Sequence, residues 1–399
     1  FCLVMFYIYI PKMKINKKII IFTYDYPTGN SENTFIQFEI SKLLNDFDDI
    51  EIIPQKNLKK NRKKIEKKIK VNLGFSKHLN NQNIILNFFL YTIFSTDFYK
   101  ELNKILFKKN FFLKLKMSII EITQSEIAYK WIKEYKIKKS KNIIFYSFWS
   151  NYLLLTFERL KKEIKGITTI SRANGSDLNG YIKNDEYVPY IEKKFFSLDR
   201  IFLLSKLQEK LLLKKKLIKK KKTKIAPLGI YKSKKQNYKT SIKSINFLSC
   251  NNFIKIKNNL EMIEFVKKVS EQTDKKIKYY IIGEGKEYNK IKLKLNEYKK
   301  YFNFKMIKRV KSLPDFILKK NIHFFMNFST QEGMSFSIME AMSCGIPVIS
   351  SNIDANKNLV DNSRGYLLNL KKSKNSYISV SKKILKDFNK RKNYINKKK

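Results

Sequence analysis

The sequence predicts an α/β protein of two domains, each built on a parallel sheet with helices on both faces. The chain has 399 residues, and a domain takes roughly 100 to 200 residues. Hydrophobic residues make up 43% of the chain, which is enough for ordinary cores and argues against wholesale disorder. Short apolar segments alternate with helical patterns in both halves, and this alternation favours doubly wound parallel sheets.

The first half contains a series of short apolar segments that predict strands. We expect strands at residues 18–24, 48–54, 142–148, 167–170 and 199–205. Helices are expected at residues 34–44, from about residue 149, and in the very basic segment that ends at Lys222. The region up to Lys141 alternates apolar residues with lysines and indicates mainly helices, which suit a membrane-facing surface, a binding surface or an ordinary solvated surface.

The second half repeats this alternation. We expect strands at residues 245–250, 278–282, 302–307 and 346–349, and one more strand that reaches residue 328. Helices are expected from about residue 258 and at residues 287–299, 335–344 and 377–386. A polar, lysine-rich segment over residues 228–244 suits a linker. The predicted domains are therefore residues 13–227 and 245–385.

The stretch from Phe328 to Ser351, with the sequence FSTQEGMSFSIMEAMSCGIPVISS, carries the strongest functional pattern. A strand, a polar turn, a helix and a second strand follow one another. The free N–H groups at the start of the helix, around Gly333, favour an anion such as a phosphate, and glycine lets the backbone approach it. Glu332 and Glu340 flank that position and are displaced by about 8 Å along the helix. They can therefore hold two separated hydroxyl-bearing groups.

This stretch closely resembles the signature of glycosyltransferase family 4, the retaining enzymes with two Rossmann-like domains called the GT-B fold. The signature contains Glu-Gly, several apolar residues, Glu-Ala-Met, Gly and Pro-Val-Ile. The resemblance implies two Rossmann-like domains that face each other across a donor-binding cleft. It also implies that Glu332 contacts the donor sugar as a catalytic residue, that Glu340 contacts the nucleotide ribose, and that the amides of Gly333, Met334 and Ser335 bind the diphosphate.

Other segments of the C-terminal half also resemble the family. Lys257 follows the first strand of this half, where the family has a lysine that offsets charge on the departing diphosphate. The turn GEG resembles the family's Gly-Asp-Gly and contains Gly283. The sequence KRV follows the third strand, where the family's backbone meets the nucleobase. The resemblance thus makes Lys257 catalytic and assigns Gly283, Arg309 and Val310 to donor binding.

The resemblance extends to the N-terminal half. The sequence TFIQFEISKL follows a turn that contains Pro and Gly, which implies that Gly29 and Glu32 face the acceptor and the diphosphate. The sequence SRANGSDLNGY resembles Ser/Thr-Arg-Ala-His-Gly-x-Asp-Leu-Tyr, so Arg172 carries over as catalytic and Asp177 as an acceptor-side residue. Asn174 takes the catalytic position where the family has histidine, and an amide hydrogen-bonds but does not take up a proton near neutral pH.

The resemblance spans about residues 19–368, with a departure from the family pattern at Asp354, Ala355 and Asn358. It implies an enzyme that moves a hexose, with retention, from a UDP- or GDP-linked sugar to a growing polysaccharide or a lipid-linked oligosaccharide. In the family the departing diphosphate accepts the proton of the acceptor. The resemblance therefore implies neither a cofactor nor a metal ion.

The amino-acid composition indicates which binding partners the chain favours. The chain has 84 Lys and Arg residues against 34 acidic residues, a formal net charge of +50, and such a field attracts anionic lipid and polyanions. The lysines are spread along the chain with abundant Asn, Ile, Phe and Tyr, as A+T-rich coding alone produces. No nucleic-acid-binding motif is present. We therefore expect no nucleic-acid partner and a cytoplasmic protein, with an anionic membrane surface as an optional peripheral partner.

The sequence offers little for metal or disulfide chemistry. Only two histidines are present, too few for an ordinary histidine-based metal site. Cys2, Cys250 and Cys344 show no paired spacing, which indicates a reducing setting. Asp46 and Asp48 form an Asp-x-Asp triplet. In the other major glycosyltransferase fold, a triplet of this kind binds a metal ion. Asp46 and Asp48 fall at a helix-to-strand turn, where Asp is favoured for turn chemistry, so we expect no metal there.

Two alternatives remain open at this stage. The first is a catalytically weakened homologue that acts as a basic membrane- or polyanion-binding protein, as Asn174, the departure at Asp354 and the charge of +50 suggest. The second is a sugar-nucleotide epimerase with two Rossmann-like domains, which the two glutamates and their Glu-Ala-Met continuation disfavour. Turnover of a nucleotide sugar excludes the first alternative, and an epimerised nucleotide sugar formed without acceptor identifies the second.

Overall fold

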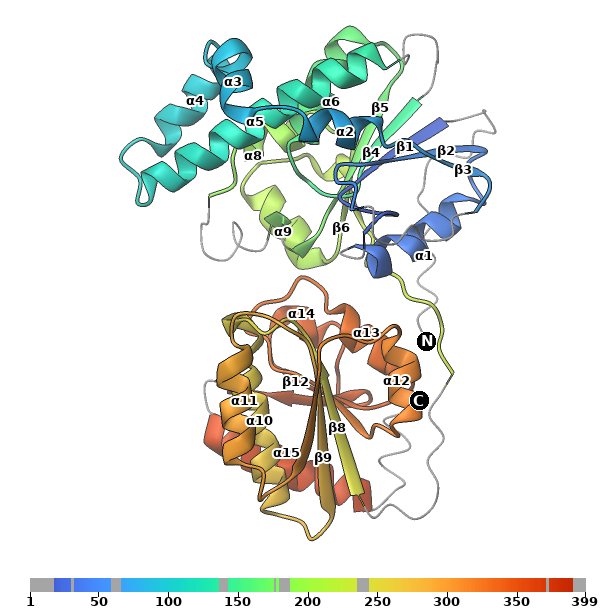
Figure 1. Cartoon of the computed structure of the whole chain (residues 1–399), viewed down its shortest axis with the longest axis vertical. Helices are drawn as coiled ribbons and strands as arrows, with labels where there is room; N and C mark the ends of the chain where they lie inside the picture. The colour runs from blue at the N-terminus through green and yellow to red at the C-terminus, as the bar shows by residue number, and fades with distance from the viewer. Residues whose placement is uncertain are drawn as a thin grey trace. The chain divides into compact units, whose positions relative to one another are not determined.

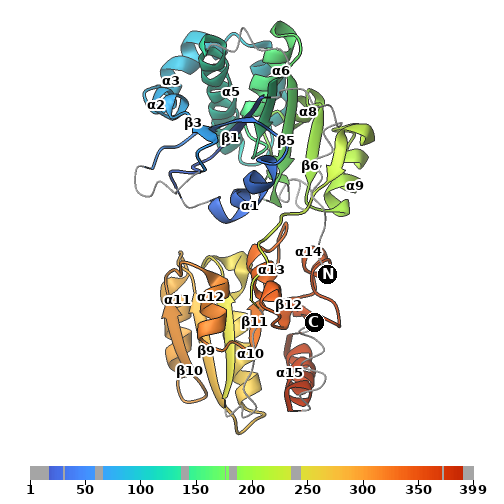
Figure 2. The same cartoon turned by 90° about the vertical axis from the view of Figure 1, so that its right-hand side faces the viewer.

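The structure is a computed structural model in which the chain forms two compact units, Phe1–Gly229 and Ile230–Lys399. Each unit contains one parallel sheet (Figure 1, Figure 2) and is described by itself. The apolar segment at residues 1–10 and Cys2 lie outside the described residues. The structure describes residues 18–29, 32–58, 66–135, 143–175, 177–178, 187–234, 244–370 and 373–389.

A seven-stranded parallel sheet forms the centre of the first unit, in the order β3-β2-β1-β4-β5-β6-β7. Ile21 in β1 lies opposite Ile52 in β2 and Tyr146 in β4. The strands are β1 (Lys18–Thr23), β2 (Asp49–Pro54), β3 (Ile69–Val71), β4 (Ile143–Ser147), β5 (Thr168–Ala173), β6 (Arg200–Leu203) and β7 (Thr223–Ile225).

Both faces of this sheet are buried, which explains why its central strands are apolar at nearly every position. Ile20 and Phe22 in β1 belong to a core on one face, and Ile19 and Ile21 belong to a core on the opposite face. The helices are α1 (Asn33–Leu43), α2 (Gly74–Asn80), α3 (Ile84–Asn87), the π-helix η1 (Phe88–Thr92), α4 (Thr96–Ile105), α5 (Phe111–Glu134), α6 (Leu153–Glu163), α8 (Ile191–Phe196), α9 (Lys206–Lys214) and the 3-10 turn η3 (Lys220–Lys222).

The predicted helical region before Lys141 is confirmed, since α2 to α5 occupy it. The helix expected from about residue 149 begins later, at Leu153. The backbone N–H of Leu153 donates to the side chain of Asn151 at 3.1 Å, and the side chain of Ser147 donates to the carbonyl of Trp149 at 2.6 Å. These bonds stabilise a turn after β4, because Asn and Ser side chains satisfy backbone groups that a helix would otherwise use.

The second unit has a six-stranded parallel sheet in the order β10-β9-β8-β11-β12-β13. Leu248 in β8 lies opposite Phe325 in β11 and Tyr280 in β9. Ile245 and Phe247 belong to a core on one face, and Leu248 belongs to a core on the other. The strands are β8 (Ser244–Cys250), β9 (Lys276–Ile282), β10 (Asn303–Ile307), β11 (Phe324–Asn327), β12 (Val348–Ser351) and β13 (Gly365–Leu368).

Helices cover both faces of the second sheet, as the sequence predicts. Two α-helices of this unit, α12 and α14, were not predicted. Ser312 caps α12 by accepting from the N–H of Asp315 at 3.2 Å, and a proline lies in the first turn of α12. Ser before Pro is a helix-start signal that was available in the sequence. The helices are the 3-10 turn η4 (Lys255–Lys257), α10 (Asn259–Ser270), α11 (Tyr288–Glu297), α12 (Leu313–Lys319), α13 (Phe336–Ser343), α14 (Asp354–Lys357) and α15 (Ser373–Asn389).

Candidate functional site

The strongest predicted site lies at the carboxyl edge of the second sheet. In a parallel sheet the loops that follow the strands meet at one edge, and ligands bind where the strand order reverses. Here the order reverses between β8 and β11. Lys257 lies in the segment after β8, and Glu332 lies in the loop after β11. The fold therefore brings together two residues that are far apart in the sequence.

Lys257 and Glu332 form an ion pair. Lys257 Nζ lies 2.6 Å from Glu332 Oε1, and the two side chains are 18% and 11% exposed. Ser329 Oγ also donates to Oε1, at 2.8 Å, and Asn327 Nδ2 lies at 3.4 Å. Within the described part of the chain, the second oxygen of Glu332, Oε2, has no such donor. Glu332 is thus held through one oxygen and can accept from a ligand through the other.

The segment after β8 is tied to the loop after β11 by further bonds. Asn258 has a positive φ of 50° and donates from its side chain to the carbonyl of Phe328 at 3.2 Å. The N–H of Thr330 donates to the carbonyl of Ile256 at 2.8 Å. Asn is among the residues that adopt this left-handed conformation most readily. These bonds keep Lys257 beside Glu332.

Open backbone donors lie at the start of α13. Ser335 occupies the N-cap but its side chain makes no capping bond, and its Oγ accepts from Asn327 Nδ2 at 3.0 Å. Within the described residues, the N–H groups of Gly333, Met334 and Ser335 donate to no acceptor. Free N–H groups at a helix N-terminus attract an anion. The geometry provides three such donors directly after Glu332.

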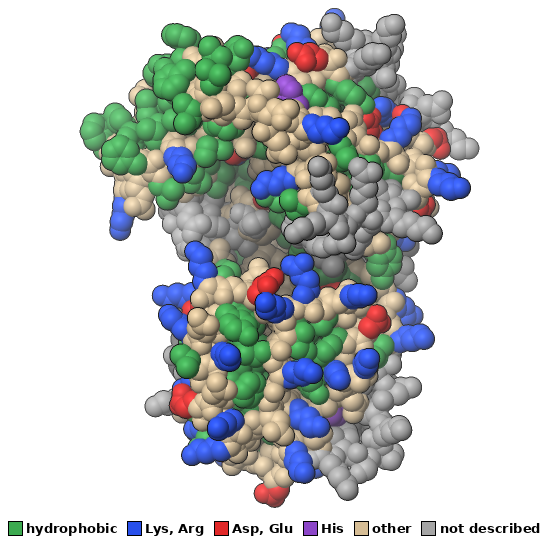
Figure 3. Space-filling view, in the orientation of Figure 1, with side chains coloured by type: hydrophobic (Ala, Val, Ile, Leu, Met, Phe, Trp, Pro, Cys, Tyr) green, Lys and Arg blue, Asp and Glu red, His purple; other side chains and the backbone are tan. Residues whose placement is uncertain are grey.

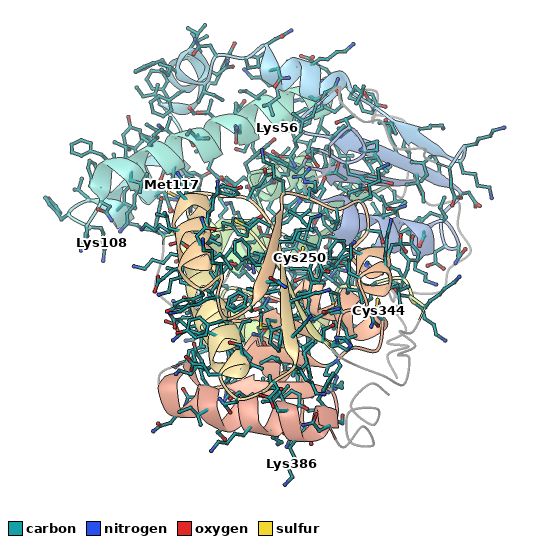
Figure 4. All side chains as sticks on the ribbon, turned by 60° about the horizontal axis from the view of Figure 1, so that its bottom comes forward. Lys56, Lys108, Met117, Cys250, Cys344 and Lys386 are labelled. Carbon is teal, nitrogen blue, oxygen red and sulfur yellow. The ribbon has the colours of Figure 1, made fainter. Side chains whose placement is uncertain are left out.

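Glu340 lies on α13, one to two turns after these donors. Burial raises the pKa of its carboxyl to about 7. No residue in the described part of the chain gives this carboxylate a hydrogen bond or an ion pair. Burial, with a smaller contribution from Glu340, raises the pKa of the Cys250 thiol to about 12, and burial raises that of Cys344 to about 11. Figure 4 labels both cysteines. Glu340 is therefore a partly buried acceptor that a ligand could satisfy.

The raised pKa of Glu340 predicts a pH dependence of stability. The carboxyl titrates near 4.5 when unfolded and near 7 when folded, so the native state binds more protons between these values and stability falls as pH rises through them. We expect Glu340→Gln to raise the free energy of unfolding by about 2 kcal/mol at pH 8 and to leave it unchanged at pH 4. Urea unfolding at the two pH values measures this. The exposed Glu297→Gln serves as control, and equal effects of both variants would contradict the prediction.

The other predicted donor residues lie in neighbouring loops of the same edge. Gly283 has a φ of 152°, and a Cβ there would lie 1.9 Å from the carbonyl oxygen of Asn251, so this turn requires glycine. Arg309 is exposed and lies 3.7 Å from Glu284, and Val310 packs against the core that contains Leu248. Among the described residues, no hydrogen bond or ion pair joins these side chains to Glu332 or Glu340. Their assignment to donor binding stays a prediction.

Glu32 lies at the corresponding switch point of the first sheet, between β1 and β4. Its carboxylate is fully buried and accepts from the N–H groups of Asp25 at 3.0 Å and Tyr26 at 2.9 Å, and from Trp149 Nε1. Burial raises its pKa, although these bonds act in the opposite direction. Gly29 lies against Asp25, whose Oδ2 would be 2.1 Å from an added Cβ. The structure therefore gives Glu32 the role of fastening the turn after β1.

Asn174 and Asp177 tie together the loops after β4 and β5. Asn174 Nδ2 donates to the carbonyl of Phe148 at 3.0 Å. Asp177 Oδ2 accepts from the N–H of Asn174 at 2.9 Å and from that of Ser150 at 3.2 Å. Both residues thus lie at the carboxyl edge of the first sheet, after β4 and β5. Their contact with an acceptor stays a prediction.

Arg172 lies inside the first unit. Its side chain is 1% exposed, and it forms an ion pair of 2.9 Å with Glu39. It also donates to the carbonyl of Ala226 at 2.5 Å and to Tyr146 Oη at 3.3 Å. Tyr146 in turn donates to Glu39. These contacts are those of a residue that supports the sheet. The catalytic role that the resemblance implies for Arg172 stays a prediction.

Sequence reasoning missed several residues that fix the predicted ones in place. Asn327 and Ser329 hold Glu332, and Trp149 holds Glu32. Each of them lies at or just after the carboxyl end of a strand. That position was the available signal, because loops at this edge converge on the switch point.

Two doubly wound Rossmann-like units, with polar side chains at their carboxyl edges, place the chain in the GT-B class. Residues 231–399 match the family described as Glycosyl transferases group 1. The family resemblance and the fold class predicted from the sequence are both confirmed. A search of curated proteins gives no match.

Several solved structures resemble nearly the whole chain. TarM has a TM-score of 0.65 at 12% identity, over 96% of this chain and 94% of that chain. WaaG, a glycosyltransferase involved in lipopolysaccharide biosynthesis, has a TM-score of 0.62 at 11% identity, over 95% and 94%. HepE from Anabaena, in complex with UDP and glucose, has a TM-score of 0.61 at 12% identity, over 96% and 93%. At these identities the likeness establishes the fold.

A second TarM structure differs in coverage. The S. aureus mutant in complex with fondaparinux, α-GlcNAc-glycerol and UDP has a TM-score of 0.51 at 15% identity, over 68% of this chain. This chain spans only 55% of the length of that structure.

No helix among the described residues combines the length and the apolar character that a membrane crossing requires. No group of three or more His, Cys, Asp or Glu residues in the same ranges is placed to hold a metal ion. Asp46 and Asp48 lie in the turn between α1 and β2.

Proposed function

We propose that the chain is a retaining hexosyltransferase that uses a nucleotide sugar as donor. The observation that carries the proposal is the ion pair between Lys257 and Glu332, 2.6 Å long, beside the open N–H groups at the start of α13. A cation and three backbone donors suit a diphosphate, and a carboxylate with one free oxygen suits a sugar hydroxyl. All of these groups lie at one switch point of one sheet.

Each group has a role in this proposal. The N–H groups of Gly333, Met334 and Ser335 bind the diphosphate, and Lys257 offsets the negative charge that develops on it as the glycosidic bond breaks. Glu332 orients the hexose through Oε2. Glu340 accepts from the ribose hydroxyls, which satisfies a carboxylate that otherwise lacks a partner. Because the cation and the amides already oppose the diphosphate charge, the proposed transfer needs no metal ion.

The acceptor side belongs to the first unit in this proposal. The departing diphosphate takes the proton of the acceptor hydroxyl on the face from which it leaves, so the configuration of the sugar is retained. Asn174 orients groups by hydrogen bonding and need not take up a proton. WaaG is involved in lipopolysaccharide biosynthesis, and the HepE structure contains UDP and glucose. We accordingly propose a growing polysaccharide or a lipid-linked oligosaccharide as acceptor and UDP- and GDP-sugars as the first donors to examine.

Donor binding tests the proposal most directly. Purified protein is incubated with UDP-, GDP- and ADP-sugars, and binding and hydrolysis are measured. We expect one donor class to bind, and Glu340→Ala to weaken that binding by about tenfold to a hundredfold, because the loss of a carboxylate that accepts hydroxyl hydrogen bonds costs about 1.5–3 kcal/mol. The exposed Glu297→Ala is the matched control. Absence of binding and hydrolysis with every donor would contradict the proposal.

The alternative of a weakened homologue that only binds polyanions has less support. This alternative gives no function to the ion pair between Lys257 and Glu332 or to the open N–H groups at the start of α13. It also predicts salt-sensitive vesicle binding without any sugar-nucleotide turnover. Donor hydrolysis by the wild type that Glu332→Ala abolishes would exclude it.

A further inference from the structure

An apolar surface lies on the helices that the first unit adds between β3 and β4. Among the described residues, nineteen large hydrophobic side chains are exposed, and twelve of them lie between Ile85 and Met117. We call these twelve side chains the apolar face. Figure 3 shows apolar side chains gathered over the part of this unit that contains α3, α4 and the first turns of α5. The remaining exposed hydrophobic residues are scattered, as is normal for soluble surfaces.

The most exposed members of the apolar face are aromatic. Phe94, Phe107 and Phe112 are 83%, 96% and 83% exposed. Phe107 lies in the turn between α4 and α5 with a φ of 63°, a conformation that bulky residues rarely adopt. Nothing in the interior of the unit requires this ring, since it is almost wholly exposed. The turn therefore presents an aromatic side chain outward at the end of a helical hairpin.

The same turn is basic. Lys108 and Lys109 directly follow Phe107, and Figure 4 shows Lys108 near the outer end of α5 with Met117 further along it. Residues 84–117 contain six lysines and two acidic residues. Both acidic side chains already have partners within the unit. Asp97 pairs with Lys193, and Glu101 accepts from the N–H of Tyr190 at 2.9 Å. The surface around the apolar face is therefore cationic.

We propose that the apolar face is a peripheral docking surface for a lipid bilayer that contains anionic lipids. Aromatic and aliphatic side chains flanked by lysines suit the boundary between headgroups and acyl chains, where rings insert and ammonium groups meet phosphates. This combination distinguishes the apolar face from the other described surfaces, where exposed hydrophobic side chains are scattered. The proposal does not depend on the transferase reaction and concerns a different surface from the donor site.

A vesicle-binding experiment tests this surface without any donor. The full chain is mixed with vesicles of phosphatidylcholine, with or without phosphatidylglycerol, and the bound fraction is measured by flotation. We expect binding to the anionic vesicles, and a loss of about a hundredfold or more in partitioning for the triple variant Phe94→Ser, Phe107→Ser, Phe112→Ser, because each partly inserted ring contributes about tenfold. Added salt should weaken the binding of the wild type without abolishing it, since ring insertion is not electrostatic.

Control variants separate the possible outcomes. Leu293, in α11, and Phe196, in α8, are also strongly exposed but lie outside residues 85–117, so Leu293→Ser with Phe196→Ser should leave partitioning unchanged. Equal partitioning of the triple variant and the wild type would overturn the proposal. Conversion of a dimer to a monomer by the triple variant, with vesicle binding unchanged, would also overturn it and assign the apolar face to a second copy of the chain. Circular dichroism confirms that the variants are folded.

Discussion

Replacing Arg172 by methionine is expected to lower the free energy of unfolding of the first unit by about 3–5 kcal/mol. The guanidinium is buried and neutralises Glu39 at 2.9 Å, so its removal leaves a buried carboxylate without its cation. Removing one partner of a buried ion pair costs this much because the remaining charge loses its compensation. The substitution also removes the donor to the carbonyl of Ala226. Urea unfolding followed by circular dichroism measures the loss.

A surface pair of the same type provides the control. Arg159 pairs with Glu126 but is 41% exposed, so Arg159→Met should change the free energy of unfolding by less than about 1 kcal/mol. Adding Glu39→Leu to Arg172→Met should recover part of the stability, since removing both charges avoids the unpaired carboxylate. If Arg172→Met unfolds like the wild type yet transfers no sugar, the supporting role is wrong and the catalytic role implied by the resemblance gains weight.

The sequence predicted the two-unit fold because each sheet is buried on both faces. Burial on both faces makes strands such as β1 and β8 continuous apolar runs, which stand out between basic helices. The elements that escaped prediction lack this signature. β3 is a three-residue edge strand with no fully buried residue, and α12 is a short helix. Short elements at an edge depend on their neighbours more than on their own sequence.

The candidate donor site could be predicted in its residue types but not in its contacts. The motif around Glu332 gave the glutamates, the glycine and the helix start, since these lie within one stretch of sequence. The ion pair with Lys257 joins positions 75 residues apart, and only the strand order brings them together. Among the described residues Glu340 has no partner, and this depends on what packs around α13, so its raised pKa is visible only in the folded unit.

Arg172 shows that a sequence motif does not reveal whether a side chain is buried. Its motif resembles that of catalytic arginines, yet the motif does not report burial. In the fold, the Arg172 side chain points into the layer between β5 and α1, where Glu39 and Tyr146 engage it. A charged residue at the end of a strand can face either the loops or the interior. Only the packing of α1 against the sheet decides between these two directions.

Replacing Lys257 by alanine is expected to reduce the rate of sugar transfer by about a hundredfold to a thousandfold, as the loss of one preorganised donor to a developing negative charge does. The loss should fall mainly on kcat, because the charge on the diphosphate increases as the glycosidic bond breaks. Stability should change little, since Ser329 still donates to Glu332 Oε1 at 2.8 Å and the pair is partly exposed. Steady-state kinetics with the donor identified by binding measures kcat and KM separately.

Lys255→Ala is the matched control for this prediction. Lys255 lies in the same 3-10 turn, two residues before Lys257, but it is exposed and has no ion pair among the described residues. If both variants lost the same activity, the general basic charge of the segment would explain the effect and Lys257 would have no special role. A double variant, Lys257→Ala with Glu332→Ala, adds a second test. Because the two side chains share one site, their combined loss should be smaller than the product of the single losses.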